Sequence, residues 1–171
     1  MDNVKIIDNF LSPAEFGALR SSMLSTAFPW NFTPMKVSKV DSDDELTKYY
    51  NFQNYHLFYG NGIPQSTYFN VLSDVLIKIN PAALIKIKAN LTTRTTRVIK
   101  SSWHVDNTYK NSTTAVFYLN TNNGFTFFKD GSKVESVENR LVTFPSSLIH
   151  AGTTSSDTDY RAVINLNYFL E

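Results

Sequence analysis

YRAVINLNYFL, residues 160–170, alternates between polar and apolar side chains over most of its length. Because successive side chains of a β-strand point to opposite faces, the stretch predicts a strand with two unlike faces. One face would carry Ala162, Ile164, Leu166 and Tyr168, and the other Arg161, Val163, Asn165 and Asn167. A buried charge is costly unless it is paired, so a face with an arginine and two asparagines indicates a polar site if it points inward.

Several shorter stretches upstream of this strand also predict β-structure. In residues 83–91 apolar residues alternate with Lys86, Lys88 and Asn90, as in a half-buried strand. Further strands are predicted at residues 113–120, at 125–128 and 134–137 as a hairpin around Lys129-Asp130-Gly131, and at 141–144. This succession of antiparallel strands favours a sandwich, a jelly roll or a barrel.

The first half of the chain predicts helices that support this sheet. After a short strand at residues 4–7, Ser12 and Pro13 are typical of a helix start, and Glu15 adds a carboxylate to the first turn. A second helix is predicted over residues 65–80, where Pro81 ends it. Each has an apolar stripe, so we expect both helices to cover the sheet.

Residues 29–64, between the two predicted helices, are rich in aromatic side chains but show little periodicity. The sequence therefore predicts a long connection. A long ordered loop in a compact domain is often a lid or a binding loop, so it is a candidate lining for a substrate site. The alternative is that its rings pack over the edge of the domain.

Length and composition restrict the class of protein. The 171 residues predict one domain, 1–171, and 42% hydrophobic with 18% charged residues predicts a folded chain. The net charge of +1, with no basic run, gives no support for nucleic-acid binding. The absence of cysteine means that any metal must use nitrogen and oxygen ligands. Without a signal-like start or a long apolar run, we expect a cytoplasmic protein with no membrane partner.

Four residues in the second half of the chain form a pattern with chemical meaning. His104 and Asp106, two apart in Trp103-His104-Val105-Asp106, share one side of an extended segment, and His150 follows 46 residues later. Two histidines and a carboxylate suit non-haem Fe(II) with open positions. A simple structural His–Asp pair is the alternative, but Arg161, which ten residues separate from His150, is suited to bind a carboxylate bidentately.

This order resembles the 2-oxoglutarate/Fe(II) oxygenases of the prolyl 4-hydroxylase-like group, whose pattern is H-x-D, a distal histidine, and an arginine or lysine about ten residues later. Residues 6–13, IIDNFLSP, resemble the family's entry strand and first helix, and residues 124–128, GFTFF, lie where a Gly-Gly-x-Thr-x-Phe segment is often found. The resemblance covers residues 1–28 and 85–171, and it looks closest to small members encoded by phages.

The resemblance implies a mainly β, double-stranded β-helix fold of the jelly-roll or cupin-like kind. It implies Fe(II) bound by His104, Asp106 and His150, and the 5-carboxylate of 2-oxoglutarate paired with Arg161. The implied activity is a dioxygenase that consumes 2-oxoglutarate and O2, releases succinate and CO2, and hydroxylates a substrate. Ascorbate is a further candidate cofactor. The primary substrate would be a peptide or a small molecule, with peptidyl proline as the first hypothesis, and a phage-encoded member would work in the host cytoplasm.

The sequence departs from the family pattern at two places. Asn123 replaces the first glycine of the pair, and Lys88, Asn90 or Thr92 stands where a tyrosine often contacts the co-substrate. By its chemistry Asn90 is the candidate replacement. Thr126 and Asn165 are further candidates for the co-substrate pocket, whereas Trp103 is expected to pack in the core and His56 to be a surface or structural histidine.

Two other functions compete with the oxygenase. The first is a non-catalytic jelly-roll structural or binding protein of a phage, in which His104 pairs with Asp106 and Arg161 balances a buried acid. The second is a cupin-like hydrolase or isomerase that uses zinc or manganese. Neither a hydrolase nor an isomerase accounts for an arginine that ten residues separate from the last ligand.

Overall fold

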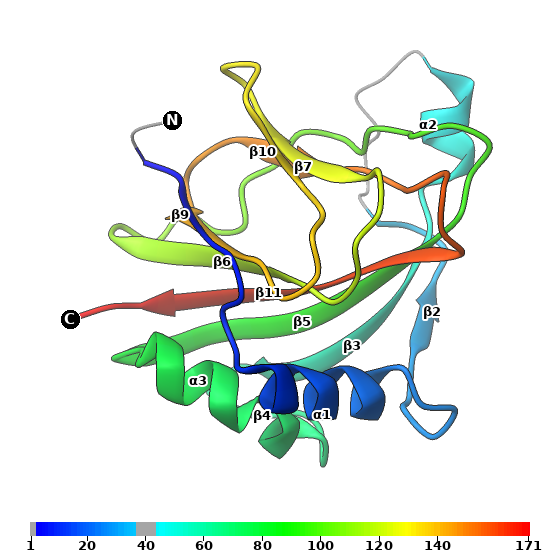
Figure 1. The fold of residues 1–171 in the computed structure, drawn as a ribbon. Helices are drawn as coiled ribbons and strands as arrows, with labels where there is room; N and C mark the ends of the chain where they lie inside the picture. The colour runs from blue at the N-terminus through cyan, green and yellow to red at the C-terminus, as the bar shows by residue number, and fades with distance from the viewer. Residues whose placement is uncertain (1–2, 37–43) are drawn as a thin grey trace.

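The computed structural model describes residues 3–36 and 44–171, in which three α-helices and a short 3-10 turn accompany β-strands (Figure 1). In chain order the elements are β1 Lys5–Ile7, α1 Pro13–Met23, β2 Asn31–Thr33, α2 Glu45–Tyr49, β3 Gln53–Gly60, β4 Ile63–Pro64, η1 Phe69–Leu72, α3 Ser73–Ile79, β5 Ala83–Thr93, β6 Ser112–Tyr118, β7 Phe125–Phe128, β8 Lys133–Glu135, β9 Leu141–Pro145, β10 His150–Gly152 and β11 Tyr160–Phe169. The predicted mainly β fold class is confirmed, although the short helix α2 was not anticipated.

The strands form two antiparallel sheets. The large sheet has the order β1-β9-β6-β11-β5-β3-β2, with β4 paired to β3, and the small sheet has the order β10-β7-β8. Figure 1 shows α1 and α3 on one side of the large sheet, and β7 and β10 on its other side. Side chains from both sheets form a small core between them, so the arrangement is a jelly-roll-like sandwich with a helical layer outside: Val116, Tyr118, Phe128, Val134, Val142, Phe144 and Val163.

β11 lies at the centre of the large sheet, between β6 and β5, and its two faces differ as predicted. Ala162, Ile164, Leu166 and Tyr168 belong to the main core beneath α1 and α3. The opposite side chains line a cavity between the sheets: Arg161, Val163, Asn165 and Asn167. The alternation read from the sequence is therefore confirmed, and the polar face does point inward.

The helices agree with prediction at their caps but not in length. Ser12 caps α1, with its side chain accepting from the Glu15 amide while the Glu15 carboxylate accepts from the Ser12 amide. The second helix was predicted to begin at residue 65, but it begins at Phe69 with a 3-10 turn. It ends at Ile79, and the C-cap residue Asn80 adopts a left-handed conformation before Pro81. None of the helices in the described residues is long and apolar enough to cross a membrane.

The prediction of a long connection over residues 29–64 is wrong, because β3 runs through it. β3 pairs antiparallel with β5 and places Leu57 opposite Lys88. One face of β3 buries His56, Phe58 and Gly60. His56 occupies a buried position of this strand and interrupts the apolar alternation by which a strand is recognised in the sequence. Its ring nitrogens form hydrogen bonds with the Pro29 carbonyl and the Ser66 hydroxyl. His56 is thus a buried structural residue.

Candidate metal centre and its cavity

The main chains of His104 and His150 are hydrogen-bonded to each other, although 46 residues separate them. His104 lies in the connection between β5 and β6, and His150 begins β10. The amide of each donates to the carbonyl of the other, both at 3.0 Å, in an isolated antiparallel bridge. The fold itself therefore brings the two imidazoles side by side, with their ring centroids 4.6 Å apart.

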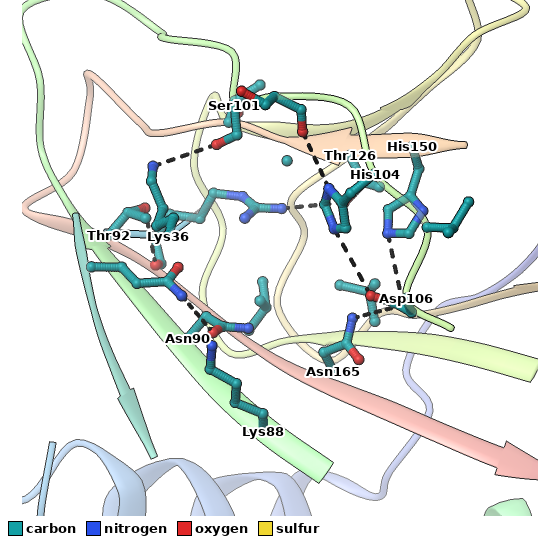
Figure 2. Close-up of a pocket in the computed structure, with 18 of the residues that line it drawn as sticks. Lys36, Lys88, Asn90, Thr92, Ser101, His104, Asp106, Thr126, His150 and Asn165 are labelled. Carbon is teal, nitrogen blue, oxygen red and sulfur yellow. Dashed lines mark hydrogen bonds and ion pairs between the residues drawn. The ribbon is translucent and has the colours of Figure 1, made fainter. Parts of the chain in front are cut away.

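The two imidazoles and the Asp106 carboxylate converge on one point (Figure 2). His104 Nε2 lies 3.8 Å from Asp106 Oδ1, and His150 Nε2 lies 3.8 Å from Asp106 Oδ2. One potential ligand atom from each residue lies within 4.8 Å of the others. Since metal bonds to such ligands are roughly 2.0–2.2 Å, two ligand atoms of one ion are at most about 4.4 Å apart, so only a small adjustment is needed.

Backbone carbonyls fix the proton on both histidines. His104 Nδ1 lies 3.2 Å from the Ser102 carbonyl oxygen, and His150 Nδ1 lies 2.9 Å from that of Leu148. A carbonyl oxygen only accepts, so each Nδ1 carries the hydrogen and each Nε2 presents a lone pair toward the common point. Burial also lowers the pKa of His150, more than the nearby Asp106 raises it, which favours the neutral, metal-binding form.

Within residues 3–36 and 44–171, the side-chain hydrogen bonds to the Asp106 carboxylate all reach one oxygen. Oδ2 accepts from the Thr114 hydroxyl at 2.7 Å, from the Asn165 amide at 3.2 Å and from the Asn167 amide at 3.1 Å. This leaves Oδ1 for another partner. Burial alone would raise the pKa of Asp106, but His150 and the Thr114 and Asn165 hydrogen bonds outweigh it and lower the pKa below its usual value. The carboxylate is therefore ionised near neutral pH.

Arg161 is buried, with only 6% of its surface exposed, and the described side chains that accept its hydrogen bonds are neutral. Nε donates to the Ser136 hydroxyl at 2.8 Å, Nη2 donates to the Thr126 hydroxyl at 3.3 Å, and the guanidinium lies 5.4 Å from the centroid of the Tyr118 ring. Within residues 3–36 and 44–171, no carboxylate lies within 4.0 Å of the guanidinium. Arg161 is thus a buried cation that lacks an acidic partner in the described chain.

Gly124 makes room for the arginine. A Cβ at this position would lie 2.7 Å from Arg161 Cδ and 2.7 Å from the Thr154 carbonyl oxygen. Real Cβ atoms do not approach other atoms this closely, so any larger residue would displace the arginine or the backbone. Steric contact with Arg161 therefore explains why a glycine stands at the start of the GFTFF segment.

One cavity of about 320 Å³ connects the histidine–aspartate group with Arg161. Its floor comes from β5 and β11, where the strand register places Thr92 opposite Arg161 and Lys88 opposite Asn165. Figure 2 shows Lys36 extending toward Ser101, to which its ammonium donates at 3.4 Å. Burial, and secondarily the charge of Arg161, lowers the pKa of Lys36 to about 8.

The structure places every residue that the sequence singled out for the site on this one cavity. His104, Asp106 and His150 lie together at one end, and Asn90, Thr126 and Arg161 also line the cavity. Asn165 lines it too, but its amide donates to Asp106. Sequence reasoning missed Lys36, Gln53, Lys86, Thr114 and Asn167. Of these, Asn167 had a signal, since it shares the polar face of the last strand with Arg161.

Comparison with known proteins gives a match in structure alone. No protein-family model matches the sequence, and no curated protein matches it. A crystal structure of a Pseudomonas putida prolyl-4-hydroxylase superposes with a TM-score of 0.59 at 15% identity, over 99% of this chain and 93% of that one. The chain has the fold of the 2-oxoglutarate oxygenases. This confirms the fold that the sequence resemblance implied.

Two further structures with this oxygenase fold differ in their bound molecules. A prolyl hydroxylase from Trichoplax adhaerens, in complex with a hypoxia inducible factor peptide fragment, gives a TM-score of 0.62 at 17% identity and covers 99% of this chain and 84% of that one. The epimerase SnoN, in complex with Fe3+, alpha ketoglutarate and nogalamycin RO, gives 0.64 at 12% identity, with 98% and 79% covered. The oxygenase fold thus accommodates both peptides and small molecules.

Proposed function

We propose that this protein is an Fe(II)- and 2-oxoglutarate-dependent oxygenase. The observation that carries the proposal is the buried Arg161 guanidinium, without an acidic partner in the described chain, at one end of a cavity whose other end holds two histidines and an aspartate. An unpaired buried cation is costly, so it indicates an anionic ligand that completes the site. A dicarboxylate that also reaches the metal meets both requirements.

The donor set fits iron. Two neutral imidazoles and one carboxylate on one side of an ion are the ligands of non-haem Fe(II) oxygenases, and they leave about three positions open. The bound iron would couple the oxidative decarboxylation of 2-oxoglutarate by O2, to succinate and CO2, with transfer of one oxygen atom to a substrate C–H bond. His104, Asp106 and His150 supply the fixed face, and the surrounding hydrogen bonds hold their orientation.

The other end of the cavity fits a carboxylate. A guanidinium can bind a carboxylate through two parallel hydrogen bonds, and Ser136 and Thr126 already fix its plane. Arg161 Nη1 faces Gly152, where no side chain blocks it: a Cβ on that glycine would lie 3.6 Å away. Thr126 adds a hydroxyl beside the guanidinium, and we propose it as the second contact for the 5-carboxylate, with Asn90 as a more distant alternative.

The competing functions explain less. A purely structural jelly roll predicts that Arg161 balances a buried acid, yet no acid in the described residues lies within 4.0 Å of it. A zinc or manganese hydrolase would use the triad but has no use for the arginine. The SnoN complex with iron and alpha ketoglutarate has the same fold, which supports the oxygenase over both.

An anaerobic absorption titration tests the proposal without a known substrate. Fe(II) and then 2-oxoglutarate are added to the metal-free protein, and a saturable visible charge-transfer band is expected because 2-oxoglutarate chelates the iron. Asp106→Ala should abolish the band, whereas Asp159→Ala, which removes an exposed carboxylate paired with Arg94, should leave it unchanged. A wild-type protein that gives no band and is not stabilised thermally by any divalent ion would refute the proposal.

A further inference from the structure

The cavity is far more basic than the chain as a whole. The chain carries a net charge of +1, yet the charged side chains that line the cavity, among the described residues, are four cations and one carboxylate. The cations are Lys36, Lys86, Lys88 and Arg161, and the carboxylate is Asp106, a proposed metal ligand. A 2-oxoglutarate bound at Arg161, near Lys36, would leave two lysines of the cavity without a partner.

Those two lysines stand at the metal end of the cavity. Lys86 and Lys88 project from the same face of β5, and the register places them opposite Asn167 and Asn165. These are the two amides that donate to Asp106. Directly paired residues have Cβ atoms about 4.5–5.5 Å apart, so the lysine stems start one strand away from the side chains that hold the metal ligand.

The co-substrate end lies further along the same strand. Thr92, which pairs with Arg161, is four residues beyond Lys88, a distance of about 13 Å at 3.3 Å per residue. The stems of the two lysines therefore start well away from Arg161, although all three side chains line one cavity. An anion at the lysine pair would lie beside the metal and away from the proposed position of the 5-carboxylate.

The environment of Lys88 favours binding of a ligand over free solvation. Lys88 is half-buried, its ammonium lies 5.0 Å from the centroid of the Tyr55 ring, and Figure 2 shows it extending toward Asn90. Burial, reinforced by the like charge of Lys86, lowers the pKa of Lys88 even though Asp106 acts in the opposite direction. In the described chain neither lysine has a carboxylate within 4.0 Å.

We propose that Lys86 and Lys88 bind an oxyanion group of the primary substrate, a carboxylate or a phosphate, and so make a small anionic molecule the substrate class of this oxygenase. This inference rests on the proposed iron site. Peptidyl proline, the first hypothesis from the family resemblance, is neutral and would leave the half-buried Lys88 ammonium without an anion, whereas Lys86 is exposed to solvent. Gln53 on β3 also lines the cavity, and Tyr55 on the same strand contacts the Lys88 ammonium.

A binding measurement tests the lysine pair without a known substrate. The protein is loaded with Ni(II) as a redox-inert substitute for Fe(II), so that no turnover occurs. Saturating 2-oxoglutarate is added so that Arg161 is occupied. Inorganic phosphate and acetate are then titrated by calorimetry. Lys88→Met and Lys86→Met should each lower the affinity for the more tightly bound anion about 10- to 100-fold, which is the loss expected for one charge-assisted contact.

Two variants control this measurement. Lys88→Arg keeps the charge and should retain most of the binding, and Lys5→Met, which removes an exposed lysine from β1, should bind like the wild type. Tighter binding of phosphate or of acetate would identify the substrate's anionic group. If neither anion binds, or if the Lys86→Met/Lys88→Met double variant binds as tightly as the wild type, the inference is wrong.

A turnover assay with Fe(II) then addresses the substrate itself. Succinate release is measured with a panel of small carboxylates and phosphate esters, each beside its neutral amide or free alcohol. Anionic members should stimulate release, and Lys88→Met should raise KM with little change in kcat. Equal stimulation by the neutral partners would contradict the inference. A wild-type protein without a charge-transfer band refutes the proposed function, whereas a normal band with lysine-independent anion binding refutes this inference alone.

Discussion

Replacing Arg161 by methionine should separate co-substrate binding from folding. In the presence of 2-oxoglutarate the change removes one partner of a buried, hydrogen-bonded charge pair, which costs about 2–5 kcal/mol. The dissociation constant of 2-oxoglutarate should therefore rise about 30- to 4,000-fold. In the metal-free protein the change removes hydrogen bonds to Ser136 and Thr126, each worth about 0.5–1.5 kcal/mol, but it also removes an unpaired buried cation. These effects oppose each other, so the free energy of unfolding should change by less than about 2 kcal/mol.

The two quantities are measured on the same preparations. The 2-oxoglutarate dissociation constant comes from the anaerobic charge-transfer titration, and the free energy of unfolding comes from urea denaturation. Arg161→Lys keeps the charge but loses the bidentate geometry, so its 2-oxoglutarate dissociation constant should lie between those of the wild type and Arg161→Met. Arg94→Met, which removes an exposed guanidinium paired with Asp159, is the control. Strong destabilisation of the metal-free Arg161→Met protein, with unchanged 2-oxoglutarate affinity, would refute the reasoning and favour a structural arginine.

Three further predictions concern residues around the cavity. Thr114→Val removes a hydrogen bond to Asp106 and should weaken divalent-metal affinity about 10- to 100-fold by calorimetry, whereas unchanged affinity would show that this hydroxyl is unimportant. Lys36 has a pKa of about 8 and is charged below it, so 2-oxoglutarate should bind less tightly as the pH rises from 7 to 9. Lys36→Met should flatten that profile, and an equally steep profile in the variant would exclude Lys36 as its cause. Gly124→Ala forces a contact with Arg161, so it should destabilise the fold by about 1–3 kcal/mol and weaken the binding of 2-oxoglutarate. A variant with the wild-type free energy of unfolding and the wild-type dissociation constant would contradict the steric argument.

The last strand and the pattern of candidate ligands could be predicted because both depend on the spacing of residues along the sequence. The last strand alternates cleanly because one face packs on the helices and the other faces the cavity, so its periodicity records both environments. His104 and Asp106 are two residues apart, and the distance in sequence to His150 and Arg161 is typical of one family. The residues of this pattern were therefore recognisable before the fold was known, and the structure places them on one cavity.

The features that the sequence concealed depend on tertiary pairing. β3 was missed because its buried face includes His56, whose partners, Pro29 and Ser66, come from other segments. The lysines of β5 looked like the solvated face of a half-buried strand, and only the small sheet above them turns that face into a cavity wall. Lys36 follows the short edge strand β2, and the sequence around it has no periodicity that would mark it as a cavity residue. In each case the partner that defines the residue's environment lies far away in sequence.

The backbone bridge between His104 and His150 has a consequence for how the protein would acquire the proposed metal. Because the two imidazoles are held together by main-chain hydrogen bonds, the ligands need little rearrangement to bind an ion. A preformed site with two nitrogen ligands and one oxygen ligand binds Ni²⁺, Cu²⁺ and Zn²⁺ more tightly than Fe²⁺. An ion bound in purified protein would thus reflect affinity and the metals available to it, so treatment with a chelator followed by anaerobic reloading with Fe(II) must precede any assay of turnover.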